Sequence, residues 1–218
     1  MAQTLPAPVG IFGGTFDPVH FGHLRPALEL YEQLSLQQMR LVPCSVPPHR
    51  PQPLASVGQR LAMLRLAVST EPALEIDERE LNRSGPSYMV DTLSSLRKEL
   101  GDTPLCLCLG VDAFLGLPGW QRWRELLSLA HIVVAHRPGW QLDKRSVRSE
   151  LGTLMAQHRQ QDVAALRAGP AGTVLLQPVT QLAISATVVR ERIGAGRSAR
   201  YLLPDDVWHY IQQQKLYF

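Results

Sequence analysis

Two histidines, His20 and His23, stand three positions apart in the stretch GIFGGTFDPVHFGHL, which covers residues 10–24. An apolar strand pattern precedes the stretch and a helical pattern follows it, so Gly22 is expected to open a helix. A helix N-terminus offers free N–H groups and about half a positive charge, which attract phosphate. Two imidazoles there could donate hydrogen bonds to phosphoryl oxygens. A structural turn explains the spacing almost as well, and a metal site made by the two histidines has weaker support because no third ligand is near.

The glycines of this stretch favour a ligand that lies against the main chain. Gly13 and Gly14 have no side chain and so allow close approach to the backbone. The sequence contains neither GxxxxGK[ST] nor GxGxxG, which excludes a P-loop and argues against a dinucleotide-binding fingerprint.

A second cluster of this kind lies far downstream, in AISATVVRERI at residues 183–193. Ser185 is expected to cap a helix that begins near Ala186, and Thr187 and Arg190 then share one helical face. Hydroxyl and N–H donors with the guanidinium of Arg190 could hold phosphate oxygens. The alternative is an ordinary N-cap with an arginine that faces solvent. Two clusters in one chain favour a polyphosphate over a monophosphate.

The pattern of the whole chain predicts an α/β protein with a parallel sheet covered by helices. Short apolar runs alternate with longer helical patterns. The expected strands cover 9–12, 39–43, 73–78, 105–110, 131–136 and 173–179. The expected helices cover 24–34, 57–68 with Ser56 as N-cap, 88–100 ended by Gly101, 123–129 and roughly 144–160. Ligands of such sheets bind outside the carboxyl ends of the strands, near a switch in strand order. GGTFDPVHFGH, PPHR, GVD and HRPG each follow a strand, which predicts one shared cleft.

Composition indicates one globular domain over residues 1–218. We expect residues 141–172 to be a polar insertion that ends in a surface loop, and residues 180–218 to form a helical C-terminal part. A net charge of +3 suits small anionic ligands but falls short of the basic stripe typical of nucleic-acid binders.

The three cysteines include no CxxC pair, and Cys106 and Cys108 are expected to be small buried residues on one face of a strand. The chain begins without a signal-peptide pattern, and no uncharged apolar run reaches the ~18 residues of a membrane span. We therefore expect a cytoplasmic protein that binds neither membrane nor nucleic acid and is a monomer or a weak homo-oligomer.

GTFDPVHFGH (14–23) and ISATVVR (184–190) together resemble the two signatures of the HxGH nucleotidyltransferases. Within that superfamily, several intervening pieces are similar to those of bacterial nicotinate mononucleotide adenylyltransferases. These pieces are LVPCSVPPHR (41–50), SYMVDTL (87–93), LGVDAFLGLPGW (109–120), IVVAHRPG (132–139) and YLLPDDVWHYI (201–211). The resemblance covers nearly the whole chain apart from residues 141–172. The sequence departs from the common pattern at Ala186, where many members carry serine, and at Arg50, where lysine is common.

The resemblance implies a Rossmann-like, doubly wound parallel sheet of nucleotidyltransferase type with helices on both faces. It also implies that the phosphate of nicotinate mononucleotide attacks the α-phosphorus of ATP, so that deamido-NAD forms and pyrophosphate leaves. Magnesium would be bound to the ATP phosphates, with no metal site made by the protein. Catalysis would rest on positioning and electrostatic stabilisation, with no covalent intermediate.

The same resemblance assigns three sets of residues. The catalytic set is His20, His23 and Arg190. The ATP-binding set is Gly13, Gly14, Thr15, Phe16, Gly110, Asp112, Ser185 and Ala186. The set for nicotinate mononucleotide is Pro47, His49, Arg50, Thr92, Trp120 and Arg137. From the residues alone, Asp112 could instead be a helix N-cap and Trp120 could be core packing, with Trp123 as the competing aromatic.

Other functions stay open at this stage. A sister transferase that acts on phosphopantetheine would share both signatures, and a CTP-using relative would share the first. A non-catalytic nucleotide sensor would keep the site without turnover, and a nucleic-acid binder has only the mild basicity in its favour.

Overall fold

The sheet is the scaffold on which both sequence clusters sit. The computed structural model describes residues 5–47, 51–141 and 150–218. Seven strands, all parallel, lie in the order β3-β2-β1-β4-β5-β7-β6. They are β1 (Val9–Gly14), β2 (Gln38–Pro43), β3 (Leu74–Ile76), β4 (Leu105–Gly110), β5 (His131–His136), β6 (Arg159–Gln160) and β7 (Val174–Pro178).

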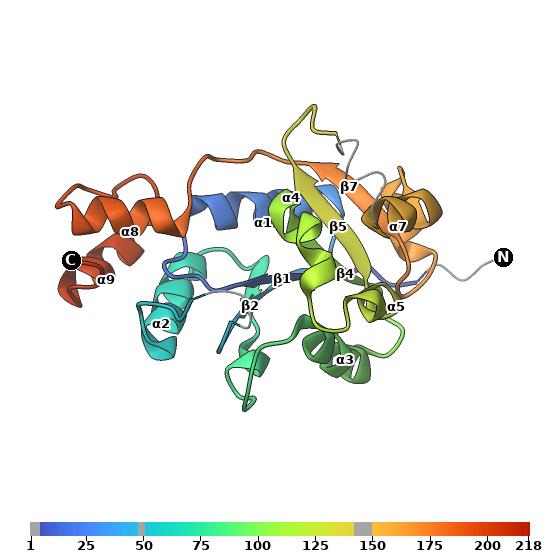
Figure 1. The fold of residues 1–218 in the computed structure, drawn as a ribbon, viewed down its shortest axis with the longest axis horizontal. Coiled ribbons are helices and arrows are strands. Elements are labelled where there is room, and N and C mark those ends of the chain that lie inside the picture. The colour runs from blue at the N-terminus through green and yellow to red at the C-terminus, as the bar shows by residue number, and fades with distance from the viewer. Residues whose placement is uncertain (1–4, 48–50, 142–149) are drawn as a thin grey trace.

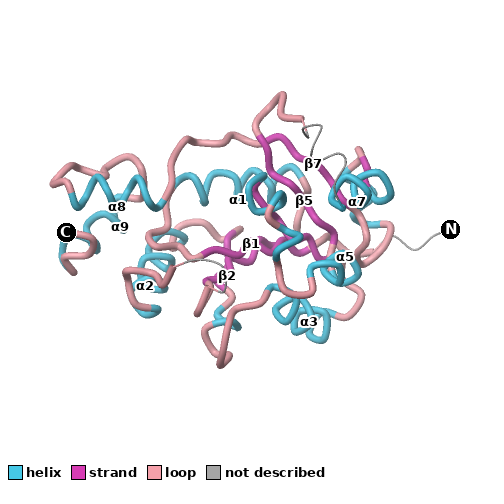
Figure 2. Tube along the Cα trace, in the orientation of Figure 1, coloured by secondary structure: helices cyan, strands magenta, loops and turns pink. Residues whose placement is uncertain are grey.

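Helices cover both faces of the sheet, as Figure 2 shows in cyan around the magenta strands. They are α1 (Phe21–Gln33), α2 (Val57–Val68), α3 (Met89–Leu100), α4 (Val111–Leu115), α5 (Leu126–Leu129), α7 (Glu150–His158), α8 (Ala186–Gly194) and α9 (Asp205–Gln213). The C-terminal helices α8 and α9, orange to red in Figure 1, lie at the end of the molecule opposite the N-terminus, and α9 contacts α2. None of the helices that the structure describes is long and apolar enough to cross a bilayer.

The strands separate two apolar cores because their side chains alternate between the two faces. In β4, Cys106 and Cys108 join the core that is built with α1, α2, α8 and α9. Leu105 and Leu107 join the other core, with α3, α5 and α7. Cys106 and Cys108 are thus buried side chains on one face, as the sequence predicted.

The order of the strands reverses between β1 and β4, which are neighbours at the centre of the sheet. Their pairing covers Val9–Ile11 against Leu105–Leu107, whereas both strands continue beyond it, to Gly14 and Gly110. The two carboxyl ends therefore lie side by side without a shared ladder. In open α/β sheets this switch point is where a ligand enters.

Local signals in the sequence set several helix ends correctly. Ser56 and Gln59 form a capping box at the start of α2. Ser185 caps α8 by accepting the N–H of Val188. Gly101 ends α3 with a φ of 54°, which a residue with a Cβ adopts at a cost.

Other boundaries differ from the prediction. Helix α1 begins at Phe21 rather than at residue 24, and the expected strand 73–78 is reduced to β3 because Glu78–Glu80 forms a 3₁₀ turn. The expected helix 123–129 is a 3₁₀ turn, Trp123–Glu125, followed by α5.

The prediction of one helix over 144–160 followed by a surface loop was wrong in its second half. Helix α7 ends at His158, and residues 144–149 lie outside the described residues. Arg159–Gln160 then adds strand β6 to the edge of the sheet, and the 3₁₀ turn Val163–Arg167 follows. Leu166 of this turn is fully buried in the core on the α1 face. The sequence did not predict this packing because the segment is mostly polar and only a few apolar residues join the core.

Replacing Leu166 with alanine should therefore lower the free energy of unfolding by about 2–5 kcal/mol, the usual cost of such a truncation in a core. Leu54→Ala removes the same atoms from a side chain that is 73% exposed and should cost far less. Urea unfolding followed by circular dichroism measures both. Equal losses of unfolding free energy in the two variants would indicate that Leu166 is not buried and that this segment is a surface loop.

Candidate active site at the carboxyl end of the sheet

His20 and His23 meet at the start of α1, directly after the loop that leaves β1. His20 is the N-cap residue, but its side chain makes no capping hydrogen bond. The two imidazole rings are stacked, with centroids 3.7 Å apart and planes 26° apart. The ring of Phe16 meets the edge of His23 at 5.2 Å. Both rings are thus fixed at a helix N-terminus, as the spacing predicted.

The stacking argues against a metal site made by the two histidines. An imidazole binds a metal through a lone pair in its ring plane. Two rings that lie nearly parallel direct these lone pairs side by side rather than to one point. Among the residues that the structure describes, no group of three His, Cys, Asp or Glu side chains could hold an ion.

His20 is held uncharged by its surroundings. Only 3% of the residue is exposed, and this burial lowers its pKa from 6.5 to about 4. Its Nδ1 atom has no hydrogen-bond partner among the described residues. A buried polar atom without a partner is costly and is typical of functional sites. A phosphate oxygen would accept a hydrogen bond from such a ring.

Gly22 brings the two clusters into direct contact. A Cβ atom at this position would lie 2.7 Å from the carbonyl oxygen of Ile184, just before the cap of α8, and 2.9 Å from Nδ1 of His20. A real Cβ does not approach another atom so closely. The glycine between the two histidines is therefore what allows the N-termini of α1 and α8 to converge.

Arg190 of α8 faces the loop after β1, so the alternative of an arginine that faces solvent was wrong. Its Nη1 atom donates to the carbonyl oxygen of Asp17 at 2.6 Å and lies 3.8 Å from the Asp17 carboxylate. Its Nη2 atom lies 3.5 Å from the hydroxyl of Thr187, so the two residues share a face as expected. The side chain keeps 25% of its surface exposed, which leaves part of the guanidinium accessible to a ligand.

Arg60 of α2 also holds the loop after β1, and the sequence did not predict this role. The residue is buried in α2, and its Nη1 atom donates to the carbonyl oxygens of Thr15 at 2.8 Å and of Cys44 at 2.7 Å. Its Nη2 atom donates to the carbonyl oxygen of Ser45 at 3.3 Å. One side chain thus ties together the loops that follow β1 and β2. In the sequence it is an arginine in an amphipathic helix, where exposure is the default.

Glu29 of α1 was also missed, and it holds the segment that leads to α8. The residue is buried, and its carboxylate accepts the N–H of Thr180 and a hydrogen bond from Arg25, both at 2.6 Å. Burial raises the pKa of Glu29, but these hydrogen bonds outweigh it and the net direction is downward. The carboxylate is therefore charged where it anchors this segment. No local pattern indicates a partner so far along the chain.

The residues predicted for the adenosine side lie at the switch point. Gly110 ends β4 and is the N-cap of α4, so Asp112 is not the cap but an exposed residue of the first turn. Its carboxylate is at the expected edge of the sheet and is open to a ligand. Gly13 and Gly14 end β1 on the other side of the same point.

The residues predicted for nicotinate mononucleotide have different environments. Trp120 is half-buried against the core on the α3 face, whereas Trp123 is buried, which leaves Trp120 as the better candidate for stacking. Arg137 is exposed directly after β5, and Pro47 is buried after β2. His49 and Arg50 lie outside the described residues.

Thr92 is fully buried, which was not foreseen. Its hydroxyl donates to the Glu80 carboxylate at 2.6 Å, and Arg83 approaches the same hydroxyl at 3.3 Å. Burial raises the pKa of Glu80, and the hydrogen bond from Thr92 opposes this effect. A substrate could use the Thr92 hydroxyl only after Glu80 released it.

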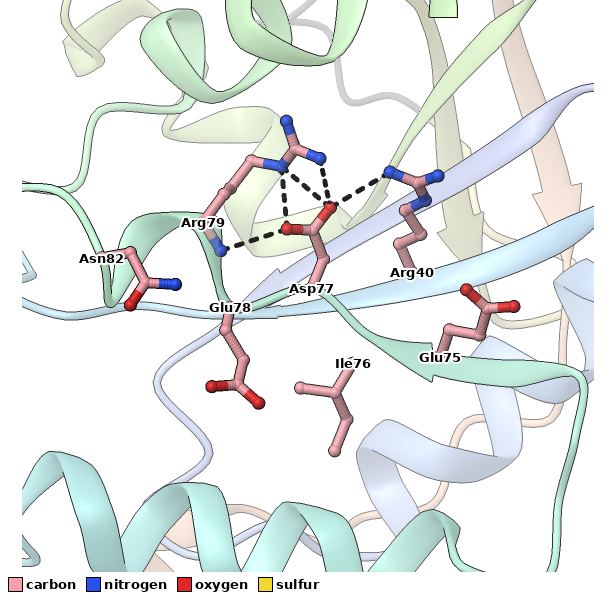
Figure 3. A pocket seen from close by; sticks show the side chains of 7 residues that line it. All are labelled: Arg40, Glu75, Ile76, Asp77, Glu78, Arg79 and Asn82. Atoms are coloured by element: carbon pink, nitrogen blue, oxygen red, sulfur yellow. Dashed lines mark hydrogen bonds and ion pairs between the residues drawn. The ribbon is translucent and has the colours of Figure 1, made fainter. Parts of the chain in front are cut away.

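A hollow away from the motifs is a structural feature and not part of this site. It lies at the β2–β3 edge, where Arg79 donates to both carboxylate oxygens of Asp77 at 2.8 Å and Arg40 approaches the same group at 3.3 Å (Figure 3). Both arginines also reach Glu99 of α3, at 2.7 and 2.9 Å. Arg40, Arg79 and Asp77 are thus paired within the hollow, and through Glu99 the two arginines tie α3 to the edge of the sheet.

Comparison with known proteins shows the family. The family model described as cytidylyltransferase-like matches residues 11–192. A protein of Methylococcus capsulatus is 51% identical over 96% of this chain and 99% of its own length. A protein of Cellvibrio japonicus is 52% identical over 96% of this chain and 98% of its own. Both are named as probable nicotinate-nucleotide adenylyltransferases. The chain belongs to the nicotinate-nucleotide adenylyltransferase family.

The fold of this adenylyltransferase family member is shared with a solved structure of distant sequence. The nicotinic acid mononucleotide adenylyltransferase of Plasmodium falciparum superposes with a TM-score of 0.73 at 14% identity, over 97% of this chain and 98% of that one. The all-parallel sheet with helices on both faces is therefore the Rossmann-like nucleotidyltransferase fold, as the sequence predicted.

Replacing Gly22 with alanine should separate the two motifs. Because the new Cβ would meet the backbone oxygen of Ile184, we expect a loss of about 1–3 kcal/mol in the free energy of unfolding. Gly58→Ala in α2, where a Cβ meets no atom within 4 Å, should instead add about 0.5–1 kcal/mol. Urea unfolding of both variants is the measurement. A gain at Gly22 as large as that at Gly58 would contradict the contact.

The lowered pKa of His20 should appear in the pH dependence of stability. Between pH 6.5 and about 4 the unfolded chain binds a proton at this histidine and the folded chain does not, so stability falls as the pH falls. His20→Asn keeps a residue that is favourable at an N-cap. It should make the slope shallower by up to about 1.4 kcal/mol per pH unit in this range. Parallel curves of unfolding free energy against pH for the two proteins would contradict the assignment.

Proposed function

We propose that this chain joins ATP and nicotinate mononucleotide to give deamido-NAD and pyrophosphate. The observation that carries the proposal is the contact of Gly22 with Ile184, which brings two helix N-termini and Arg190 together beside the switch point. Two converging N-termini suit a ligand with several phosphates. Relatives about half identical over the full length carry the name of this activity. The P. falciparum structure described as complexed with NaAD supports the same product.

The chemistry needs positioning and charge stabilisation more than proton transfer. The phosphate of the mononucleotide is already an anion at neutral pH, so its attack on the α-phosphorus of ATP needs no strong base. His20 enters the reaction uncharged because of its burial, and it would donate a hydrogen bond to an α-phosphoryl oxygen. His23, stacked on it, would contact the same group. Both rings would stabilise the charge that develops in the transition state.

On the ATP side, Arg190 and the N-terminus of α8 at Ser185 and Ala186 would hold the β- and γ-phosphates. Gly13 and Gly14 would lie against the phosphates and ribose, together with the backbone of Thr15 and Phe16. The exposed carboxylate of Asp112, beside Gly110, would accept hydrogen bonds from ribose hydroxyls. Ala186 in place of serine costs little if only its N–H is used.

For nicotinate mononucleotide, Trp120 would stack on the pyridine ring, and Arg137 would neutralise the phosphate or the ring carboxylate. Pro47, which follows β2, would contribute to this side, and the resemblance adds His49 and Arg50. Thr92 would join this side only if Glu80 released its hydroxyl, with which it forms a hydrogen bond. Magnesium would enter as Mg–ATP, held by the phosphates, because the stacked imidazoles do not converge on an ion.

The deciding experiment measures pyrophosphate release with ATP and each of three acceptors. We expect turnover with nicotinate mononucleotide, a lower kcat/KM with the amide mononucleotide, and none with phosphopantetheine. A higher kcat/KM for the amide form would overturn the acid assignment. ATP binding without any product would indicate a nucleotide sensor. A steep salt dependence of affinity for DNA or RNA would favour nucleic acid as the partner.

His23→Ala is the control that ties turnover to this site. Loss of one donor to the transition state should lower kcat about 10²- to 10³-fold. Near-normal turnover of the variant would remove His23 from the mechanism.

A further inference from the structure

The carboxylate of Asp17 is a buried charge in the loop between β1 and α1, within the first of the two motifs. Only 4% of the residue is exposed. Oδ2 accepts the N–H of Leu54 at 2.9 Å, and Oδ1 accepts the N–H of Ala55 at 3.1 Å. Oδ1 also accepts the hydroxyl of Tyr217 at 2.6 Å. The side chain of the penultimate residue thus reaches the loop that precedes His20.

Tyr217 is built into this position. Its ring packs against the core on the α1 face, together with Ile211 and Val207 of α9. Burial raises the pKa of its hydroxyl, and the hydrogen bond to Asp17 raises it further, so the group stays protonated and donates. The short distance to a charged acceptor indicates a strong hydrogen bond.

Arg190 is the group that competes for the same carboxylate. Its Nη1 atom is 3.8 Å from Oδ2 of Asp17, too far for a hydrogen bond, while it donates at 2.6 Å to the main-chain carbonyl of the same residue. A buried carboxylate with fewer donors would attract the guanidinium more strongly. The hydrogen bonds that the Asp17 carboxylate already accepts therefore determine how closely the guanidinium of Arg190 approaches it.

We propose that Tyr217 is a positioning residue, which satisfies Asp17 and so leaves the guanidinium of Arg190 available to the phosphates of ATP. The inference rests on the proposed function, because it takes ATP as the ligand of Arg190. It assigns the C-terminal residues a part in substrate binding although they contribute no group to the reaction. Without the Tyr217 hydroxyl, Asp17 and Arg190 form a closer ion pair that ATP has to break.

The test compares Tyr217→Phe with the wild-type chain. Phenylalanine keeps the ring and its packing and removes only the donor. We expect affinity for α,β-methylene-ATP, measured by calorimetry, to fall about tenfold, the scale of one hydrogen bond to a charged group. Tyr210→Phe is the matched control. Among the residues that the structure describes, the hydroxyl of Tyr210 in α9 makes no hydrogen bond. This variant should bind the analogue as the wild type does.

A double-mutant cycle separates positioning from general loss of structure. In the Arg190→Met background, Tyr217→Phe should cause no further loss of affinity, since the guanidinium to be positioned is gone. A purely structural effect of Tyr217 would lower affinity equally in both backgrounds and would overturn the proposal. Wild-type affinity in the single variant Tyr217→Phe would overturn it as well.

The outcome is independent of the acceptor substrate. The titration uses the ATP analogue alone. Its result therefore still tests the role of Tyr217 if the chain shows no turnover with nicotinate mononucleotide. If the wild-type chain did not bind the analogue at all, the proposed function itself would fail at its first substrate.

Discussion

The approach of the Ile184 carbonyl to Gly22 is the constraint on which the site depends. It sets the distance between the N-termini of α1 and α8, two regions of positive potential that would repel each other without an anion between or beside them. The sequence meets the steric demand with a residue that has no side chain. It meets the electrostatic demand with the buried carboxylate of Asp17, which lies 3.8 Å from Arg190 and interacts electrostatically with Arg60. The carboxylate of Asp17 is thus a fixed internal anion at this point of the fold, and the phosphates of the proposed substrate would add further negative charge.

Three segments that are distant in sequence converge on this one loop, which joins β1 to α1. Arg60 of α2 donates to the carbonyl of Thr15, Tyr217 donates to the Asp17 carboxylate from the C-terminal end, and Arg190 of α8 donates to the Asp17 carbonyl. Each contact engages a main-chain or carboxylate oxygen of the loop. A site that binds phosphate needs this arrangement, because its own acceptors must be turned away from the ligand.

How much of this could be predicted from the sequence follows from the range of each interaction. His20, His23, Ser185 and the glycines were found because capping, helix polarity and backbone freedom act over a few residues. The sheet and its switch point followed from the alternation of short apolar runs. Arg60, Glu29 and Tyr217 were missed, since their partners are far along the chain and each alone has the pattern of a surface residue or a terminus. Strand β6 was missed because a two-residue edge strand has no periodicity. Thr92 was placed by resemblance, which gave no hint that Glu80 occupies its hydroxyl.

The burial of His20 bears on what kind of catalyst the pair can be. A general base for a neutral nucleophile would need a pKa near the pH of the medium. Burial has instead lowered the pKa of His20 to about 4. A phosphate nucleophile does not need the base. An uncharged imidazole still donates one hydrogen bond, and a phosphoryl oxygen that gains charge would accept that bond more strongly. The low pKa of His20 and its proposed role as a charge stabiliser thus have the same origin, which is the burial of the ring at the start of α1.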